Sequence, residues 1–161
     1  MPENFAGGLS DNARQAAVDI LNPCLATTID LTLCVKQAHW NLKGSSFIGL
    51  HELLDTQAEM LRDQADTIAE RCVILGGLAQ GTSATVVEAS DLEPYPQDIV
   101  NWSEHVSALK ERYMTLGARL RKAIPQVADA GDEDTADVLT GASRLVDKGA
   151  WFIGAHNEQQ A

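Results

Sequence analysis

Four long stretches of apolar residues at helical spacing constrain the fold of this chain more than any other feature of its sequence. In the first stretch, Val18, Leu21 and Leu25 recur three or four positions apart, a period that places them on one face of a helix. A chain of this kind folds as a bundle of helices whose apolar faces meet in one core. The stretches cover about residues 11–41, 47–76, 101–128 and 134–155.

The three connections between these stretches differ greatly in length. The segments 43–46 and 129–133 are short, whereas residues 78–100 are too many for a structureless loop in a small domain. We expect this long connection to cross the bundle and to hold a short helix of its own. Two short connections flanking one long crossover are typical of the ferritin-like four-helix bundle, so the sequence predicts an all-α fold of that form.

The same pattern predicts the domain boundaries. A single ferritin-like domain is expected over residues 1–161, with residues 1–12 and 156–161 as flexible tails because they carry little periodicity. Within the first stretch, Asn22-Pro23 predicts a kink or a restart of the helix. Pro23 has no N–H to donate, and Asn22 is a residue type that caps helices.

Charge and cysteine content restrict the partners and the compartment. The chain has 12 Lys and Arg against 23 Asp and Glu, and its net charge of −11 argues against a general affinity for nucleic acid. No stretch is expected to span a membrane or to act as a signal peptide, so we expect a cytoplasmic protein. The cysteines lie inside apolar helical patterns and are expected to be buried free thiols: Cys24, Cys34 and Cys72.

Two polar pairs interrupt the apolar pattern of the second stretch. His51 and Asp55 are four residues apart, so on a helix they share a face and can approach one metal ion. Asp66 and Glu70 have the same spacing. From Asp55 to Asp66 the helix axis rises roughly 16 Å, so one chain cannot bring both pairs to a single ion.

A second copy of the chain can close this separation. If two copies of the helix pack antiparallel about a two-fold axis, the first pair of one copy faces the second pair of the other, and two equivalent sites form. His39 lies just before the short turn and joins His51 at the same end of the hairpin. A mixed imidazole and carboxylate site suits Fe²⁺, although Zn²⁺ and Mn²⁺ accept the same ligands. Spacing alone leaves open that these are ordinary solvated side chains on an amphipathic helix.

The segments around these residues resemble the Dps family of small ferritin-like cage proteins. The resemblance extends from about residue 13 to residue 156 and rests on Lys36-Gln37-Ala38-His39-Trp40-Asn41, His51-Glu52-Leu53-Leu54-Asp55, and Asp66-Thr67-Ile68-Ala69-Glu70-Arg71 followed by Leu75-Gly76-Gly77. The Glu-x-x-His motif of di-iron sites within one subunit is absent from the sequence.

The resemblance implies a site that two subunits share. His39, His51 and Asp55 of one subunit would bind iron together with Asp66 and Glu70 of a partner, two iron ions per site. It further implies a hollow homo-oligomer, a dodecamer, that oxidises Fe²⁺ with hydrogen peroxide and stores the ferric mineral. Such a protein protects against oxidative damage.

Two tryptophans have alternative interpretations. Trp40 adjoins His39, so it either packs in the core or donates electrons that remove stray oxidising equivalents near the iron. Trp151, on the last stretch, is expected in the core, because Trp is highly buried on average.

The acidic residues at the start of the last stretch also have two interpretations. Acids stabilise the N-terminus of a helix, which is sufficient reason for a cluster there. The resemblance implies instead a pore through which iron enters, with Asp134 and Asp137 among its lining residues. His105 and His156 are expected to be surface or structural residues rather than ligands.

DNA is the point at which the resemblance weakens. Family members that condense DNA often use a lysine-rich tail, whereas neither residues 1–13 nor the segment after Trp151 contains Lys or Arg. Two rival functions remain: a non-enzymatic, nucleoid-associated protein that shields DNA physically, and a helical interaction module without metal. Net charge and tail composition disfavour the first, and the ligand set disfavours the second. The sequence therefore predicts a ferroxidase that stores iron.

Overall fold

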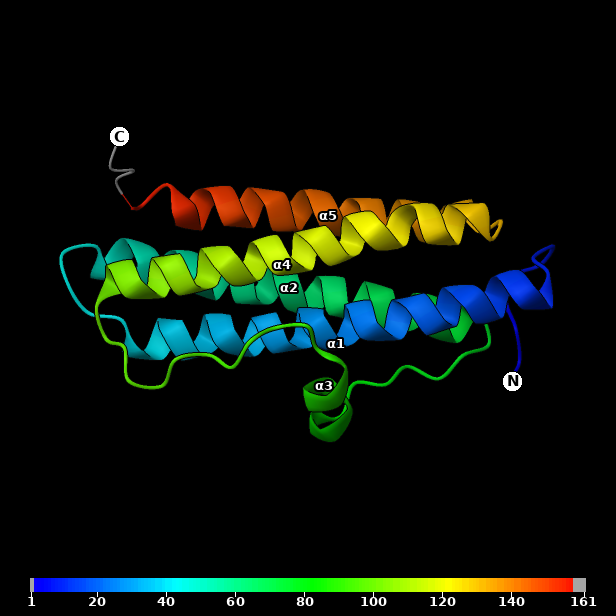
Figure 1. The fold of residues 1–161 in the computed structure, drawn as a ribbon, viewed down its shortest axis with the longest axis horizontal. Helices are drawn as coiled ribbons and strands as arrows, with labels where there is room; N and C mark the ends of the chain where they lie inside the picture. The colour runs from blue at the N-terminus through cyan, green and yellow to red at the C-terminus, as the bar shows by residue number, and fades with distance from the viewer. Residues whose placement is uncertain (1, 158–161) are drawn as a thin grey trace.

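Five helices and no β-strand make up residues 2–157, the part of the chain that the computed structural model describes. Four long helices lie side by side as a bundle, and one short helix lies outside it (Figure 1). The predicted all-α bundle with a short helix in the long crossover is confirmed. The helices are α1 (Asp11–Asn41), α2 (Phe47–Ile74), α3 (Ser83–Ala89), α4 (Trp102–Asp129) and α5 (Glu133–Gly154).

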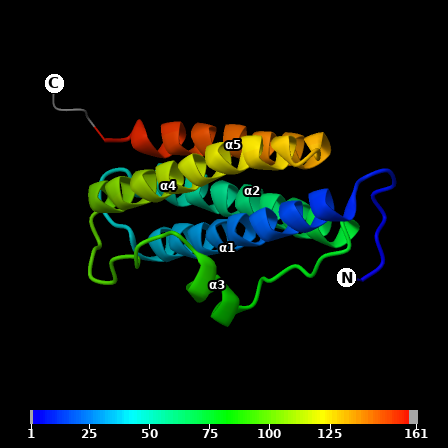
Figure 2. The ribbon, with the colours of Figure 1, turned by 45° about the vertical axis from the view of Figure 1, so that its right-hand side comes forward.

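The bundle consists of two helical hairpins. α1 packs against α2, α4 packs against α5, and α1 and α4 join the two hairpins. The crossover from α2 to α4 runs along the outside of α1, where α3 lies (Figures 1 and 2). It returns the chain to the end of the bundle at which α1 turns into α2, and there Lys43 and Asn101 form an isolated parallel bridge.

Side-chain caps fix the starts of three long helices. Ser10, Asn101 and Asp132 each accept a hydrogen bond from a backbone N–H in the first turn of the helix that follows. Each cap satisfies one of the donors that a helix N-terminus leaves unpaired. Asp132 is also fully buried and forms an ion pair of 2.7 Å with Arg71. The cap of α5 is therefore joined to the end of α2.

The predicted apolar faces meet in one core between the four long helices. Full burial of a leucine side chain stabilises the folded state by about 1.5–3 kcal/mol, so a core of this size supplies the main driving force. The largest fully buried side chains include Leu21, Leu31, Leu50, Leu54, Leu61, Leu109, Tyr113, Leu116 and Leu120. At the end of α2, Gly76 adopts a φ of +82° and stops the helix, as Gly76-Gly77 predicted.

The helix does not restart at Pro23, so this alternative is wrong, whereas the kink stays a prediction. α1 is unbroken from Asp11 to Asn41, with Pro23 inside it. Asn22 does not cap, because its side chain binds the crossover instead: Nδ2 donates to the carbonyl of Leu78 at 3.1 Å, and Oδ1 accepts from the N–H of Gln80 at 2.9 Å. Burial of Leu21, Cys24 and Leu25 around the proline holds the helix continuous despite the lost hydrogen bond.

α1 also corrects the expectation that no stretch is long and apolar enough to span a membrane. By length and composition α1 passes that test, and it alone does so in the described part of the chain. Its most apolar window is 61% buried inside the structure. The apolar character of α1 is therefore accounted for by its place in the core.

The two predicted tails are only partly described: residues 2–10 precede α1, residues 11–12 belong to it, and residues 156–157 follow α5. In the first of them, the backbone N–H of Phe5 donates to the carbonyl of Ile74 at 2.9 Å. Residues 158–161 of the second lie outside the described residues. The flexibility expected of both tails, and the single domain over residues 1–161, stay predictions.

Candidate metal centre

Two histidines from different helices stack at the end of the α1–α2 hairpin. His39 lies in the last turn of α1 and His51 in the second turn of α2. Their ring centroids are 3.7 Å apart and the ring planes differ by 18°. The short turn between the helices therefore places side chains twelve residues apart in direct contact.

The two histidines hold each other through reciprocal hydrogen bonds. His39 Nδ1 lies 2.8 Å from the carbonyl oxygen of His51, and His51 Nδ1 lies 2.9 Å from the carbonyl oxygen of His39. A carbonyl only accepts, so each Nδ1 carries the proton in this arrangement. Each Nε2 of a neutral ring then keeps its lone pair, the state in which imidazole binds metal.

A carboxylate faces one of these lone pairs. Asp55 Oδ1 lies 4.0 Å from Nε2 of His39. Two electron-pair donors at this distance do not stabilise each other unless a cation lies near both. Because metal–ligand distances for imidazole and carboxylate are about 2.0–2.2 Å, as for zinc, one ion can reach both atoms.

Lys36 is a neighbour of the candidate site that the sequence does not single out. Its Nζ lies 2.7 Å from Asp55 Oδ1, and it also lies over the ring of Trp40, 5.7 Å from the centroid. The hydrogen bond and the positive charge of Lys36 lower the pKa of Asp55, with smaller contributions from the two histidines. The available signal was spacing, since Lys36 precedes His39 by three residues and so shares its face of α1.

The turn that carries the two histidines is held from the side of α4. Lys43 donates to the carbonyl of Val100 at 2.8 Å, and Trp102 donates to the carbonyl of Lys43 at 3.0 Å. The indole of Trp102 lies against Gly44, where an added Cβ would sit 2.3 Å from a ring carbon. Gly44 has a φ of +126°, a conformation that favours glycine.

The second predicted pair does not meet the first within one chain. Asp66 and Glu70 are exposed on the later turns of α2, roughly 16 Å beyond Asp55 along the axis. Within residues 2–157, no group of three or more His, Cys, Asp or Glu side chains is arranged to hold a metal ion. A single chain therefore supplies only part of any site built from these five residues.

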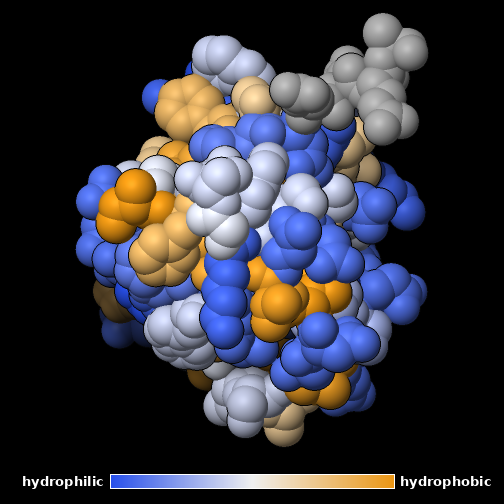
Figure 3. Space-filling model, turned by 90° about the vertical axis from the view of Figure 1, so that its left-hand side faces the viewer, coloured by the Kyte–Doolittle hydropathy of each residue, from blue (hydrophilic) through white to orange (hydrophobic). Residues whose placement is uncertain are grey.

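The surface around the second pair is apolar. One shallow hollow beside Asp66 is lined mostly by Leu25, Ile29, Leu33 and alanines, and another beside Glu70 contains Phe5, Val73 and Ile74. Leu33 is 61% exposed. Figure 3 looks onto the end of the bundle with the α1–α2 turn, where further hydrophobic side chains lie in separate groups among hydrophilic ones.

Neither tryptophan that was weighed for the core lies in it. Trp40 and Trp151 are each 68% exposed. Core packing is therefore wrong for Trp151 and is excluded as the alternative for Trp40. The average burial of Trp does not hold here because both rings point away from the interior of this chain.

The acidic residues at the start of α5 separate into two kinds. Asp132 is buried and acts as the helix cap, as the structural interpretation of the cluster expects. Asp134 and Asp137 are exposed on the first turns of α5. Their proposed place in a pore stays a prediction.

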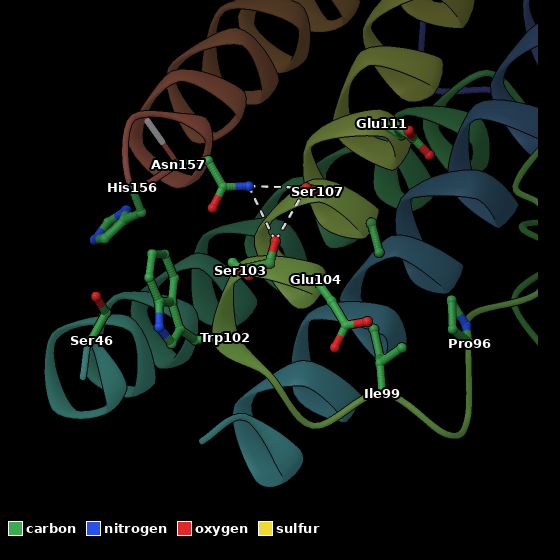
Figure 4. A pocket seen from close by; sticks show the side chains of 11 residues that line it. Ser46, Pro96, Ile99, Trp102, Ser103, Glu104, Ser107, Glu111, His156 and Asn157 are labelled. Atoms are coloured by element: carbon green, nitrogen blue, oxygen red, sulfur yellow. Dashed lines mark hydrogen bonds between the residues drawn. The ribbon is translucent and has the colours of Figure 1, made fainter. Parts of the chain in front are cut away.

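The two remaining histidines, which were expected to be surface or structural residues, both make hydrogen bonds within the chain. His105 is buried, and its Nδ1 lies 2.8 Å from the hydroxyl of Tyr95. His156 borders an open hollow of about 880 Å³ near Trp102 and Ser46 (Figure 4), and its Nδ1 bonds the carbonyl of Phe152. Asn157, which also lines that hollow, donates hydrogen bonds to the carbonyl of Ser103 and to the hydroxyl of Ser107 on α4.

The cysteines are buried free thiols, as predicted. Burial raises the pKa of Cys24 to about 11 and that of Cys34 to about 12. Burial also raises the pKa of Cys72. Thiols in this state are poor nucleophiles and poor metal ligands at neutral pH.

Comparison with known proteins gives one consistent family. The ferritin-like domain matches residues 18–160. The "DNA protection during starvation protein" of Agrobacterium fabrum is 48% identical over 153 residues, which cover 95% of this chain and 94% of the relative. The protein of that name from Mycolicibacterium smegmatis is 34% identical over 151 residues, 94% of this chain and 82% of the relative.

A solved structure agrees with this result. DpsC from Streptomyces coelicolor superposes with a TM-score of 0.93 at 29% identity, and the match covers 100% of this chain and 94% of that one. The similarity in sequence and in backbone structure therefore extends over the whole bundle.

Proposed function

The chain belongs to the Dps family of ferritin-like proteins, and from that premise we propose that it is a ferroxidase that stores iron. Membership of this family supports a role in iron storage or DNA protection. In the finer proposal, pairs of subunits oxidise Fe²⁺ at shared sites. His39, His51 and Asp55 of one subunit bind iron together with Asp66 and Glu70 of the other.

The observation that supports this proposal is that one chain already holds three of the proposed ligands close together and leaves the metal-binding nitrogens of its two histidines free. The reciprocal hydrogen bonds leave both Nε2 atoms free to bind metal, and Asp55 Oδ1 lies 4.0 Å from one of them. Rigid, correctly protonated imidazoles bind without a cost for changing tautomer. Asp66 and Glu70, exposed on the same helix, supply the carboxylates that this half lacks.

Iron is the substrate in this reaction. Two Fe²⁺ ions each give up one electron, and one hydrogen peroxide accepts both electrons and two protons to form two water molecules. Because the two electrons arrive together, no hydroxyl radical is released. Carboxylates and imidazoles suit both oxidation states, since their charge and hydrogen bonding offset the added positive charge.

Anaerobic titration with Fe²⁺, followed by peroxide, tests the proposal through ferric absorbance and assembly size. His39→Ala and Asp66→Ala should each slow oxidation strongly while leaving helical content unchanged. The matched controls are His156→Ala, at the end of the bundle, and Asp63→Ala, one turn before Asp66 and exposed. Wild-type rates in the Asp66→Ala protein contradict the site.

A mixed assembly tests the sharing directly. Subunits that lack His51 and Asp55 are inactive alone, and so are subunits that lack Asp66 and Glu70. Co-expressed, they form pairs in which one of the two sites is intact and the other has none of these four ligands. Recovery of oxidation in the mixture alone is expected if each site draws ligands from two chains.

Storage requires a closed assembly with an entry for iron. We propose a hollow homo-oligomer, a dodecamer in the form that the family resemblance implies, in the cytoplasm. Asp134 and Asp137 are proposed to line its iron-entry pore, and Trp40, which is exposed beside the site, is proposed to donate electrons to stray oxidants.

Physical shielding of DNA is the alternative function, and the charges of the chain disfavour it. The net charge is −11, and the basic residues of α4 are largely engaged. Arg112 is buried against backbone carbonyls, Arg119 pairs with Asp91, and Arg121 pairs with Asp147. We expect no retardation of plasmid DNA at near-neutral pH and moderate salt. A shift that higher salt abolishes favours the alternative.

A further inference from the structure

One exposed stripe of α2 carries more than the proposed ligands. The residues on it follow one another at spacings of three or four, so they lie along one face of the helix. Glu59 and Arg62 stand in its middle, between the two ligand pairs, and both are exposed. Within residues 2–157 neither side chain takes part in an ion pair. The stripe is His51, Asp55, Glu59, Arg62, Asp66, Glu70 and Val73.

The proposed sharing of ligands sets the register of two such helices. If His51 faces Glu70 of the second copy and Asp55 faces Asp66, the residue numbers of each facing pair add up to 121. An antiparallel pair related by a two-fold axis keeps this sum along its whole length. The axis then passes between Met60 and Leu61.

This register places opposite charges together at the axis. Glu59 of each copy faces Arg62 of the other, so one self-complementary patch forms two ion pairs. The same register places Ile48 opposite Val73, and these apolar side chains are 62% and 49% exposed in the single chain. Neither match was used to set the register. Both therefore support it independently.

We propose that Glu59 and Arg62 form intersubunit ion pairs that determine the register of the subunit pair. The partner is a second copy of this chain, and the inference rests on the proposed function because the ligand pairing defines the register. The two ion pairs lie at the centre of the contact, flanked on each side by a metal site. A slip of one helical turn in either direction breaks both Glu59–Arg62 ion pairs. In one direction it places Glu59 opposite the like charge of Asp66, and in the other it places Arg62 opposite Asp55, which the metal site needs as a ligand.

Charge reversal provides the test. In Glu59→Arg, arginines face each other at both positions, and in Arg62→Glu, glutamates do. Each variant alone should form pairs about tenfold more weakly or worse, because like charges directly opposite disrupt an interface. Co-expressed, an untagged Glu59→Arg chain and a Strep-tagged Arg62→Glu chain regain both ion pairs. The tag should then capture the untagged chain far above the share that random mixing gives.

Native mass spectrometry and circular dichroism complete the experiment. Every larger assembly from the mixture should contain the two chains in equal number, instead of the broad distribution that random mixing produces. Glu88→Arg on α3 and Lys122→Glu on α4 are matched charge reversals away from the stripe, and they should mix at random. The proposed ion pairs are refuted if variants with wild-type helical content pair normally on their own, or if the two variants mix at random when they are co-expressed. Iron oxidation is measured separately, so selective pairing without oxidation contradicts the ferroxidase and leaves the register standing.

Discussion

Gly44→Ala is expected to destabilise the protein through the turn that joins α1 to α2. The glycine has a φ of +126°, and a Cβ built there would lie 2.3 Å from Cδ1 of Trp102. Van der Waals contact between carbons requires about 3.5–4.0 Å. The indole or the turn must therefore move, although two hydrogen bonds between Lys43 and the segment Val100–Trp102 hold them together.

The expected magnitude has three parts. A residue with a side chain in a left-handed or otherwise sparsely populated conformation costs about 1–3 kcal/mol. Crowding against packed atoms costs typically about 1–3 kcal/mol more. Alanine restricts the unfolded chain and so offsets about 0.4–1 kcal/mol. The net loss is roughly 1–5.6 kcal/mol, and each kcal/mol lowers Tm by about 2–4 °C in a chain of this size.

Thermal unfolding followed by circular dichroism, at one fixed protein concentration, measures this loss. Gly49→Ala is the matched control, because no atom lies within 4 Å of a Cβ at Gly49 inside α2. It should raise stability by about 0.5–1 kcal/mol through helix propensity. Trp102→Leu in the Gly44→Ala background should recover part of the loss, since only the crowding is relieved. A Gly44→Ala protein as stable as the wild type refutes the proposed clamp.

Three further predictions concern titration. Lys36→Met should raise the pKa of Asp55 toward its ordinary value, as measured by NMR. In the wild type, the stabilisation from this ion pair is present above the ordinary carboxyl pKa and is lost as pH falls through the lowered one. The three thiols, of which Cys24 has a pKa raised to about 11, should resist Ellman's reagent at pH 8 until the protein unfolds. Burial lowers the pKa of His105, so the unfolded state binds the proton first, and stability should decline as pH falls below about 6.5. His105→Gln should remove that slope in urea titrations.

The helices could be predicted closely because local signals and tertiary packing agree. The start of α1 after Ser10 and the end of α2 before Gly76 follow from a cap and from a glycine with positive φ. Pro23 is the exception. The penalty of a proline inside a helix is local, whereas the burial of Leu21, Cys24 and Leu25 that overrides it depends on tertiary packing, which a single sequence does not state.

The shared face of the four proposed ligands on α2 could be predicted because their side chains obey the period of one helix. The protonation state of the imidazoles could not. It depends on the carbonyl that each ring meets across the turn, and thus on the exact approach of α1 to α2. Lys36 was missed for the same reason, since a lysine that pairs with an acid of the neighbouring helix and a lysine that points into water have identical sequence patterns.

The exposed tryptophans indicate that burial of some apolar side chains depends on the assembly and not on the single chain. Trp40 and Trp151 are two-thirds exposed, and Ile48 and Val73 are about half exposed, in a chain whose interior is otherwise well filled. Large apolar side chains are usually buried in the functional assembly, so an apolar residue exposed on a single chain indicates a contact with another chain. On α2 that information is specific, because one register puts apolar against apolar, acid against base and ligand against ligand. A helix face that contacts only solvent is not expected to produce the apolar, the charged and the ligand pairings about a single two-fold axis.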